Sequence, residues 1–313
     1  MDKLMDHKKL TCEFLGFQLR TPLVLSSGIL GTSVSLLGRV ARNGAGMVTA
    51  KSCGPVPRAG HPNPVVIAFE GGVLNAVGLS NPGVKSQVKF LSEAKEQLQL
   101  LETPLIASIF AGTVAEFGEV ARTIAESQPD IIELNISCPN VHDDFGTPFA
   151  ATSESAAAVT EVVKKAVTCP VSVKLMPHVP NIARIAAATV EAGADAITAI
   201  NCMPGMVVDP VTGKPVLHNK SGGISGLALK PVALRCVYEI AQAVSVPIIG
   251  VGGVSTGQDA AEMLMVGASV VGVGTAIHYR GISAMRQIGE ELISFMEQHD
   301  VPSIAALRGK SHR

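Results

Sequence analysis

Three side chains at the end of one apolar stretch have the chemistry of an active site. The stretch Ile131–Val141 reads I-I-E-L-N-I-S-C-P-N-V, an apolar run that carries Asn135 and breaks at Pro139. A thiol, Cys138, and a second amide, Asn140, flank that proline. A cysteine beside two carboxamides at the C-terminal end of a strand is typical of catalytic positions in barrel enzymes. A buried structural cysteine in a strand-to-helix turn is the alternative.

Two lysines and two glycine-containing segments add an anion-binding character. Lys174 lies within V-S-V-K-L, which has no carboxylate of its own, and Lys51 ends another apolar run. A lysine that faces a low-dielectric cavity needs an anionic partner. Val251–Val254 (V-G-G-V) and Val273–Thr275 (V-G-T) suit phosphate binding, because glycine lets backbone N–H groups approach an anion closely. This set predicts a pocket for a flat, electron-rich, phosphorylated ligand. FMN fits that description, with a lysine stabilising the charge of the reduced ring and Cys138 as general base.

These residues fall at the ends of predicted strands that alternate with helical patterns. The strands are expected at Leu23–Leu25, Ala45–Ala50, Leu105–Ile109, Ile131–Ile136, Val171–Leu175, Ala196–Ile200, Pro247–Val251 and Ser269–Val273. The helical patterns include Gly83–Gln99, Val114–Ser127, Ser153–Val167, Ile182–Ala192, Pro231–Val244 and Thr256–Val266. Apolar strands that each precede a helix favour a parallel sheet buried on both faces, and eight of them favour a closed (β/α)8 TIM barrel. A doubly wound open sheet is the alternative, but no G-x-G-x-x-G follows the first strand.

Three further segments complete the prediction of a single domain over residues 1–313. Thr11–Arg20 is expected to form a small N-terminal hairpin that covers one end of the barrel. Ser52–Pro82 and Cys202–Lys220 are too rich in Gly and Pro for helices and are predicted as long loops on the C-terminal face. Because the C-terminal ends of the strands meet at the barrel mouth, the barrel would gather Ser27, Gly28, Lys51, Ser52, Ser108, Asn135, Cys138, Lys174, Asn201, Gly252, Gly253, Gly274 and Thr275.

Composition limits the classes of function. The chain of 313 residues is 47% hydrophobic with a mean hydropathy of +0.36, so it can bury a large core. The formal net charge of −1 provides no field that would attract nucleic acid or an anionic membrane. The six cysteines are scattered without C-x-x-C, which predicts reduced thiols in the cytoplasm and no metal site. The N-terminus lacks the apolar core of a signal peptide, and the uncharged run Met263–Tyr279 contains three glycines and is too short for a membrane helix.

Four longer segments share their sequence character with one enzyme family. They are L-N-I-S-C-P-N-V, G-V-L-N-A-V-G-L-S-N-P-G, G-G-I-S-G-L-A-L-K-P-V-A-L and I-I-G-V-G-G-V, at Leu134–Val141, Gly72–Gly83, Gly222–Leu234 and Ile248–Val254. The motifs resemble those of class 1 dihydroorotate dehydrogenases, and the third motif with the I-E-L-N lead-in is most similar to the 1B branch. The likeness runs from about Phe14 to the final helix in the family's order.

The resemblance implies an FMN-containing TIM barrel that oxidises dihydroorotate to orotate in pyrimidine biosynthesis. Cys138 matches the family's base, which removes a C5 proton while hydride leaves C6 for the flavin. The implied FMN contacts are Ser27, Gly28, Lys51, Ser52, Ser108, Asn135, Lys174, Ile200, Gly226, Gly252, Gly253, Gly274 and Thr275. The implied substrate contacts are Lys51, Asn75, Ala76, Val77, Gly78, Leu79, Asn135, Asn140, Asn201 and Cys202. The 1B branch also implies a homodimeric core within a heterotetramer, whose second subunit carries FAD and a [2Fe–2S] cluster and passes electrons to NAD⁺.

Three departures from the family pattern leave alternatives open. Cys202 stands where Ser or Thr is usual, Ser108 stands where an Asn commonly touches FMN, and the short loop Val141–Pro148 carries two aspartates, Asp143 and Asp144. One alternative is a dihydropyrimidine dehydrogenase-type barrel for an uncharged pyrimidine, although such proteins usually have His where this chain has Asn140. Another is an inactive flavin-binding assembly subunit, which is opposed by an intact set of Lys51, Asn75, Asn135, Cys138 and Lys174. The chain itself does not identify the electron acceptor.

Overall fold

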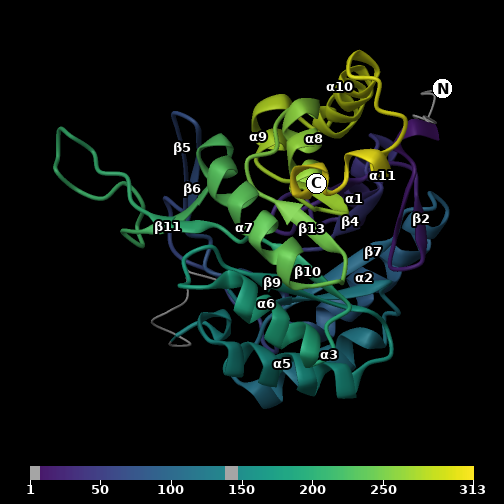
Figure 1. The fold of residues 1–313 in the computed structure, drawn as a ribbon. Coiled ribbons are helices and arrows are strands. Elements are labelled where there is room, and N and C mark those ends of the chain that lie inside the picture. The colour runs from purple at the N-terminus through teal and green to yellow at the C-terminus, as the bar shows by residue number, and fades with distance from the viewer. Residues whose placement is uncertain (1–7, 138–146) are drawn as a thin grey trace.

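Eight parallel strands close into a barrel at the centre of the molecule (Figure 1). The computed structural model describes residues 8–137 and 147–313. Around the barrel the strand order is β10-β13-β14-β3-β4-β7-β8-β9. These strands are β3 (Leu23–Leu25), β4 (Met47–Thr49), β7 (Leu105–Ile109), β8 (Ile131–Asn135), β9 (Val171–Leu175), β10 (Ala196–Ala199), β13 (Ile248–Val251) and β14 (Val270–Val273). The predicted (β/α)8 barrel is therefore confirmed, with strand bounds that differ from the expected ones only at their ends.

Amphipathic helices surround the barrel, and each packs against the next along the chain. They are α1 (Val34–Arg42), α2 (Val84–Gln99), α3 (Val114–Ala125), α5 (Ser153–Ala166), α6 (Ile182–Glu191), α7 (Lys230–Ala243), α8 (Gly257–Met265) and α10 (Ala284–Gln298). Capping boxes start α3 and α8. The side chains of Thr113 and Thr256 accept a hydrogen bond from the backbone N–H of the third helical residue, and the acidic side chain of that residue accepts one from the threonine backbone N–H. Short helical pieces are η1 (Lys8–Leu10), η3 (Phe149–Ala151), η4 (Leu227–Leu229), α9 (Ala276–Arg280), α11 (Ile304–Leu307) and η5 (Lys310–His312).

A hairpin covers the N-terminal end of the barrel, as the sequence predicted. Strands β1 (Cys12–Phe14) and β2 (Phe17–Leu19) pair antiparallel. Phe14 and Leu19 are buried in a cluster with side chains from the first or second residues of the barrel strands, namely Val24, Met47, Ile106, Ile131, Ala196, Ile249 and Val270. This apolar plug keeps water out of the end of the barrel opposite to the predicted chemistry.

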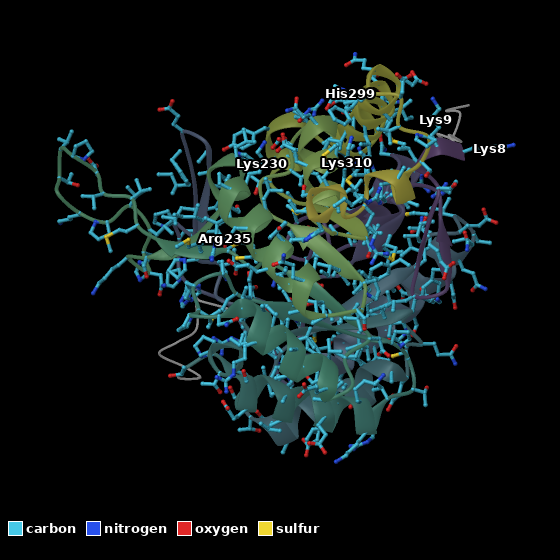
Figure 2. All side chains as sticks on the ribbon, in the orientation of Figure 1. Lys8, Lys9, Lys230, Arg235, His299 and Lys310 are labelled. Carbon is cyan, nitrogen blue, oxygen red and sulfur yellow. The ribbon has the colours of Figure 1, made fainter. Side chains whose placement is uncertain are left out.

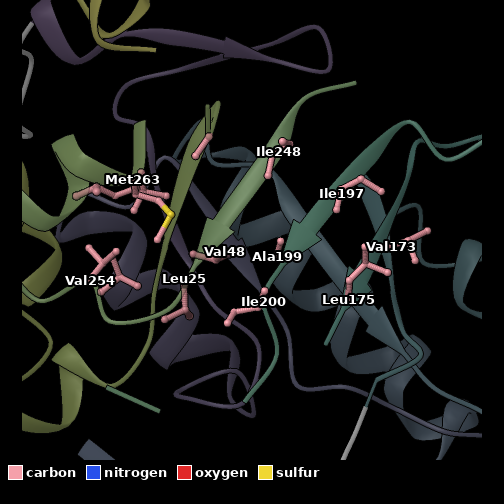
Figure 3. Close-up of a cluster of buried hydrophobic side chains, with 14 of the residues drawn as sticks. Leu25, Val48, Val173, Leu175, Ile197, Ala199, Ile200, Ile248, Val254 and Met263 are labelled. Carbon is pink, nitrogen blue, oxygen red and sulfur yellow. The ribbon is translucent and has the colours of Figure 1, made fainter. Parts of the chain in front are cut away.

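Alternate residues of each barrel strand face the helices or the barrel interior. Val173 and Leu175 of β9 belong to the main core between strands and helices, together with Ile197 and Ile248 (Figure 3). Their neighbours in the chain point the other way: Ser172 hydrogen-bonds Thr198 inside the barrel, and Lys174 lies beside Glu133. The strand periodicity thus places polar side chains inside the barrel, toward its C-terminal end.

The two glycine- and proline-rich interruptions contain regular structure that the sequence analysis missed. They contribute β5 (Val66–Phe69), β6 (Gly72–Asn75) and β11 (Met203–Gly205), which join β12 (Gly222–Ser225) in an antiparallel sheet of order β11-β12-β6-β5. The sheet buries a small cluster of Leu74, Ala76 and Leu217. Both segments lie at the C-terminal face and contain no helix, as expected, but their strands were not predicted. These short strands are stabilised by pairing between segments far apart in the chain, which local composition does not reveal.

Within residues 8–137 and 147–313, no helix is both long enough and apolar enough to cross a lipid bilayer.

Candidate active site

A cavity of about 330 Å³ lies between the C-terminal ends of the barrel strands and the four-stranded sheet. That volume lies in the range of small-molecule binding sites. The strand ends contribute Ser27, Gly28, Lys51, Ser52, Asn135, Lys174, Ile200, Asn201, Gly252, Gly253, Gly274 and Thr275 to the lining. The four-stranded sheet and the segments next to it contribute Asn75, Val77, Gly78, Leu79, Cys202 and Gly226. The structure thus brings most of the predicted cofactor and substrate residues to one cavity.

Four of the predicted site residues are not placed in this lining. Ser108 is buried one layer deeper, where its hydroxyl lies 2.8 Å from that of Ser52. Ala76 is buried within the sheet, and its backbone N–H donates to Val65. Cys138 and Asn140 lie outside the described residues. Ser108 therefore does not face the cavity, and Ser52 lies between its hydroxyl and the lining.

The anionic partner of Lys174 comes from the neighbouring strand. The ammonium Nζ of Lys174 lies 4.0 Å from Oε1 of Glu133, and the two side chains are 9% and 3% exposed. Glu133 lies on β8 and Lys174 on β9, where Asn135 is the direct register partner of the lysine. An ammonium in such a dry position requires a nearby negative charge. Glu133 supplies it, and Lys174 still lines the cavity.

A chain of hydroxyl and amide groups crosses the floor of the cavity. Ser52 lies 3.1 Å from the Ser27 hydroxyl and accepts a hydrogen bond of 3.3 Å from Nδ2 of Asn135. Oδ1 of Asn135 accepts a bond of 3.3 Å from Nδ2 of Asn201. Oδ1 of Asn201 accepts a bond of 2.8 Å from the backbone N–H of Cys202. These bonds fix the rotamers of two asparagines whose amides are the natural partners of an imide or carboxylate ligand.

The glycine pair after β13 forms the other end of the cavity. Gly252 and Gly253 have φ values of +135° and +76°, which favour glycine. A Cβ atom at Gly253 would lie 2.4 Å from Cβ of Lys230, so the first turn of α7 packs directly on this loop. Lys230, which is labelled at the start of α7 in Figure 2, reaches from there to Asp259 and Glu262 of α8 at 2.7 and 2.9 Å. The loop is therefore held rigidly by ion pairs on its outer side.

Cys202 lines the cavity next to Asn75. Nδ2 of Asn75 lies 3.9 Å from the Cys202 sulfur. Burial raises the pKa of this thiol, and the opposing effects of Lys174 and Asn75 are smaller. Cys202 therefore stays a neutral thiol near neutral pH, which makes it a poor proton acceptor.

Several side chains in or below the cavity were not singled out by the sequence analysis. They are Ser26, Glu133, Ser137, Ser225 and His278. Glu133 carried a readable signal, because it is a charged residue in an apolar strand two positions before Asn135 and so shares its face. Ser26 and Ser137 follow barrel strands, whereas Ser225 ends β12 of the four-stranded sheet and His278 lies in α9, so their directions depend on tertiary structure.

The residues of this cavity fit a flavin nucleotide. The buried hydroxyl oxygen of Ser26 has no hydrogen-bond partner among the described residues, which marks a polar position that a ligand would satisfy. A buried lysine, two oriented amides and a glycine loop supply the cation, the hydrogen-bonding groups and the close backbone approach that a phosphorylated redox ring requires.

Comparison with known proteins identifies the family. Residues 9–296 match the family model described as dihydroorotate dehydrogenase. The chain is 45% identical over 298 residues to the catalytic subunit of dihydroorotate dehydrogenase B (NAD(+)) from Methanosarcina mazei, covering 95% of this chain and 93% of that protein. Identity to the proteins of the same name from Methanocaldococcus jannaschii and Pyrococcus abyssi is 41% and 38%, again over 95% and 96% of this chain and 96% and 98% of theirs.

Proposed function

The chain belongs to the dihydroorotate dehydrogenase family, and from that premise we propose an FMN-dependent mechanism of dihydroorotate oxidation with Cys138 as the general base. The overall conversion is that of dihydroorotate to orotate in pyrimidine biosynthesis, and it makes the protein an oxidoreductase that acts on a CH–CH bond. The observation that carries the proposal is the single cavity that joins a buried lysine, two oriented amides and a glycine loop.

The chain offers FMN two distinct ends of the cavity. Gly252, Gly253, Gly274 and Thr275 would hold the phosphate. Lys174 would lie against the ring, where its positive charge favours the reduced form. When bound, FMN would supply the two-electron acceptor that no amino-acid side chain provides.

The same residues can bind and orient a planar carboxylate-bearing substrate. Asn75, Asn135 and Asn201 present amide groups to the cavity, and Lys51 adds a cation suited to a carboxylate. Cys138 follows β8 by three residues in the sequence, after Asn135. We propose that its thiolate would remove the C5 proton of dihydroorotate as hydride is lost from C6, so that a C5–C6 double bond forms.

The proposal includes a partner subunit. The three relatives are named as catalytic subunits of dihydroorotate dehydrogenase B (NAD(+)), which supports a second subunit. We propose that this chain forms a homodimeric core that joins an FAD- and [2Fe–2S]-containing subunit in a heterotetramer, as the resemblance to the 1B branch implies. Scattered cysteines without C-x-x-C support a cytoplasmic location. If the partner is required, the substrate-reduced chain alone will not be reoxidised by NAD⁺.

Anaerobic titration of the purified protein tests the substrate and the cofactor together. Dihydroorotate is expected to bleach the flavin absorbance at stoichiometric concentrations, while dihydrouracil, which lacks the carboxylate, leaves it unchanged. Bleaching by dihydrouracil alone would favour the dihydropyrimidine dehydrogenase-type alternative. Bound flavin that neither compound reduces would favour an inactive assembly subunit, and protein without flavin would refute the proposal.

A further inference from the structure

Glu133 is the one carboxylate that the described residues place beside Lys174 inside the barrel, and it has a second contact. Its Oε1 accepts a hydrogen bond of 3.0 Å from the hydroxyl of Ser108. The residue is only 2% exposed and does not line the cavity. Whatever Glu133 contributes to ligand binding therefore passes through the groups that it contacts.

The direction of the hydroxyl chain follows from the chemistry of its Glu133 end. A carboxylate only accepts hydrogen bonds, so Ser108 must donate its single proton to Glu133. Ser108 then accepts from Ser52 across their 2.8 Å contact, so Ser52 has no second proton to donate elsewhere. Toward the cavity, Ser52 can only accept, which matches the bond that it receives from Nδ2 of Asn135.

The other end of the chain requires the same direction. The backbone N–H of Cys202 can only donate, and its acceptor is Oδ1 of Asn201. Nδ2 of Asn201 then faces Asn135, whose atom at that position must be the acceptor Oδ1. The two ends therefore require the same direction. In each bond of the chain from Asn201 to Ser108, the proton points toward Glu133, and the amide oxygen and amide nitrogen of each asparagine have fixed positions.

We infer that Glu133 is a positioning residue that sets the direction of the Ser108–Ser52–Asn135–Asn201 chain and thereby fixes which hydrogen-bonding edges the cavity offers to its ligand. The inference rests on the proposed function for the identity of that ligand, orotate. Without an acceptor at the end of the chain, the Ser52 proton is free to turn toward Asn135. Donor would then meet donor, and the asparagine amide would lose its fixed orientation.

The test measures orotate binding by the change that it causes in the flavin absorbance spectrum. The variants are Glu133→Gln, Ser108→Ala and the double variant, each compared for orotate dissociation constant, flavin content and melting temperature. Ser172→Ala is the matched control. This hydroxyl is also buried inside the barrel, but it pairs with Thr198, which does not belong to the hydrogen-bond chain from Ser108 to Asn201.

In Glu133→Gln the one amide oxygen is expected to face the Lys174 ammonium, so the NH₂ group meets Ser108 and the hydrogen-bond chain loses its acceptor. Ser108→Ala removes a link of the chain itself. Loss of one hydrogen bond to a charged group predicts an orotate affinity about tenfold weaker for each variant. The double variant is expected to be no weaker than the weaker single variant, because both changes interrupt one chain. Ser172→Ala should bind as the wild type does. A purely structural role would lower the melting temperature without this non-additivity.

Three results would overturn the inference: single variants within twofold of wild type, losses that multiply in the double variant, or an equal loss in Ser172→Ala. If Glu133→Gln fails to fold, Ser108→Ala alone carries the first and third criteria. If wild-type protein holds flavin but ignores orotate, the proposed substrate is wrong. The same variants are then compared by FMN dissociation, followed by the recovery of flavin fluorescence, with the same criteria.

Discussion

Replacement of Asp259 by asparagine is expected to destabilise the protein through the loop that follows β13. Asp259 is 5% exposed and accepts from Lys230 at 2.7 Å and from the backbone N–H groups of Ser255 and Thr256 at 3.0 and 2.8 Å. Asparagine retains one acceptor oxygen, so its NH₂ group must face either the ammonium or the two N–H donors. At least one charge-assisted bond is lost, which costs about 2–3 kcal/mol.

The stability that Asp259 contributes should depend on pH. Burial of Asp259 acts to raise its pKa, but the hydrogen bonds from Lys230, Ser255 and Thr256 outweigh burial and hold the pKa below its ordinary value. The folded pKa is thus lower than that of the unfolded chain, about 3.9. The carboxylate therefore contributes stability above about pH 4 and loses it as the pH falls through the folded pKa. Asparagine does not titrate, so the difference between the two proteins should shrink only below about pH 4.

Thermal unfolding at a series of pH values measures this effect. A loss of about 2–3 kcal/mol corresponds to a melting temperature roughly 3–5 °C lower at pH 7 for a chain of this size. Glu262→Gln is the control, because its side chain is 31% exposed and its bond to Lys230 should contribute less than about 1 kcal/mol. Equal melting temperatures at pH 7, or a difference that persists undiminished at pH 3, would refute the reasoning.

Three further predictions concern the base, the substrate pocket and the apolar plug. Cys138→Ser should retain yellow, FMN-bound protein but reduce its flavin about 10²–10⁴-fold more slowly with dihydroorotate, and an unchanged single-turnover rate would exclude Cys138 as the base. Cys202→Ser should tighten orotate binding roughly three- to tenfold, because a hydroxyl replaces a weak thiol donor beside Asn75. A spectral titration that gives an unaltered dissociation constant would count against this. Phe14→Ala should lower the free energy of unfolding, measured by urea titration, by about 3–5 kcal/mol and leave FMN affinity unaltered. A loss of FMN affinity would show that the apolar plug and the cavity are coupled.

The barrel was predictable from the sequence because its strands satisfy a local rule. A parallel strand buried on both faces reads as a continuous apolar run, and the capping residues and glycines that separate such runs are equally local. Val171–Leu175 was located to the residue in this way. The sheet of β5, β6, β11 and β12 was not predictable, because its stability comes from pairs such as Ile224 with Leu74, which lie far apart in the chain.

Most of the cavity lining was predictable for a related reason: a closed barrel brings every strand end to one place, whatever the helices between them. Ser108 shows where that rule stops. It lies within β7 like Lys174 within β9, yet it is buried below Ser52 while the lysine reaches the cavity. Side-chain length decides the difference, since four methylenes carry an ammonium to the cavity from a depth at which a serine hydroxyl meets only its neighbours.

Glu133 illustrates what strand register adds to sequence. In the sequence it is an isolated acidic residue in an apolar run, and such a residue is usually exposed or at the end of a strand. In the barrel it pairs in register with Ser108 on one side and Ser172 on the other, below Asn135 and Lys174. Both neighbours in register are serines, but only Ser108 donates to it, because the Ser172 hydroxyl is paired with Thr198. A buried carboxylate with one hydroxyl donor and one ammonium neighbour is therefore connected to the cavity by two routes, a charge and a directed hydrogen-bond chain. Because the Ser108 variant interrupts only the second, it is the experiment that separates them.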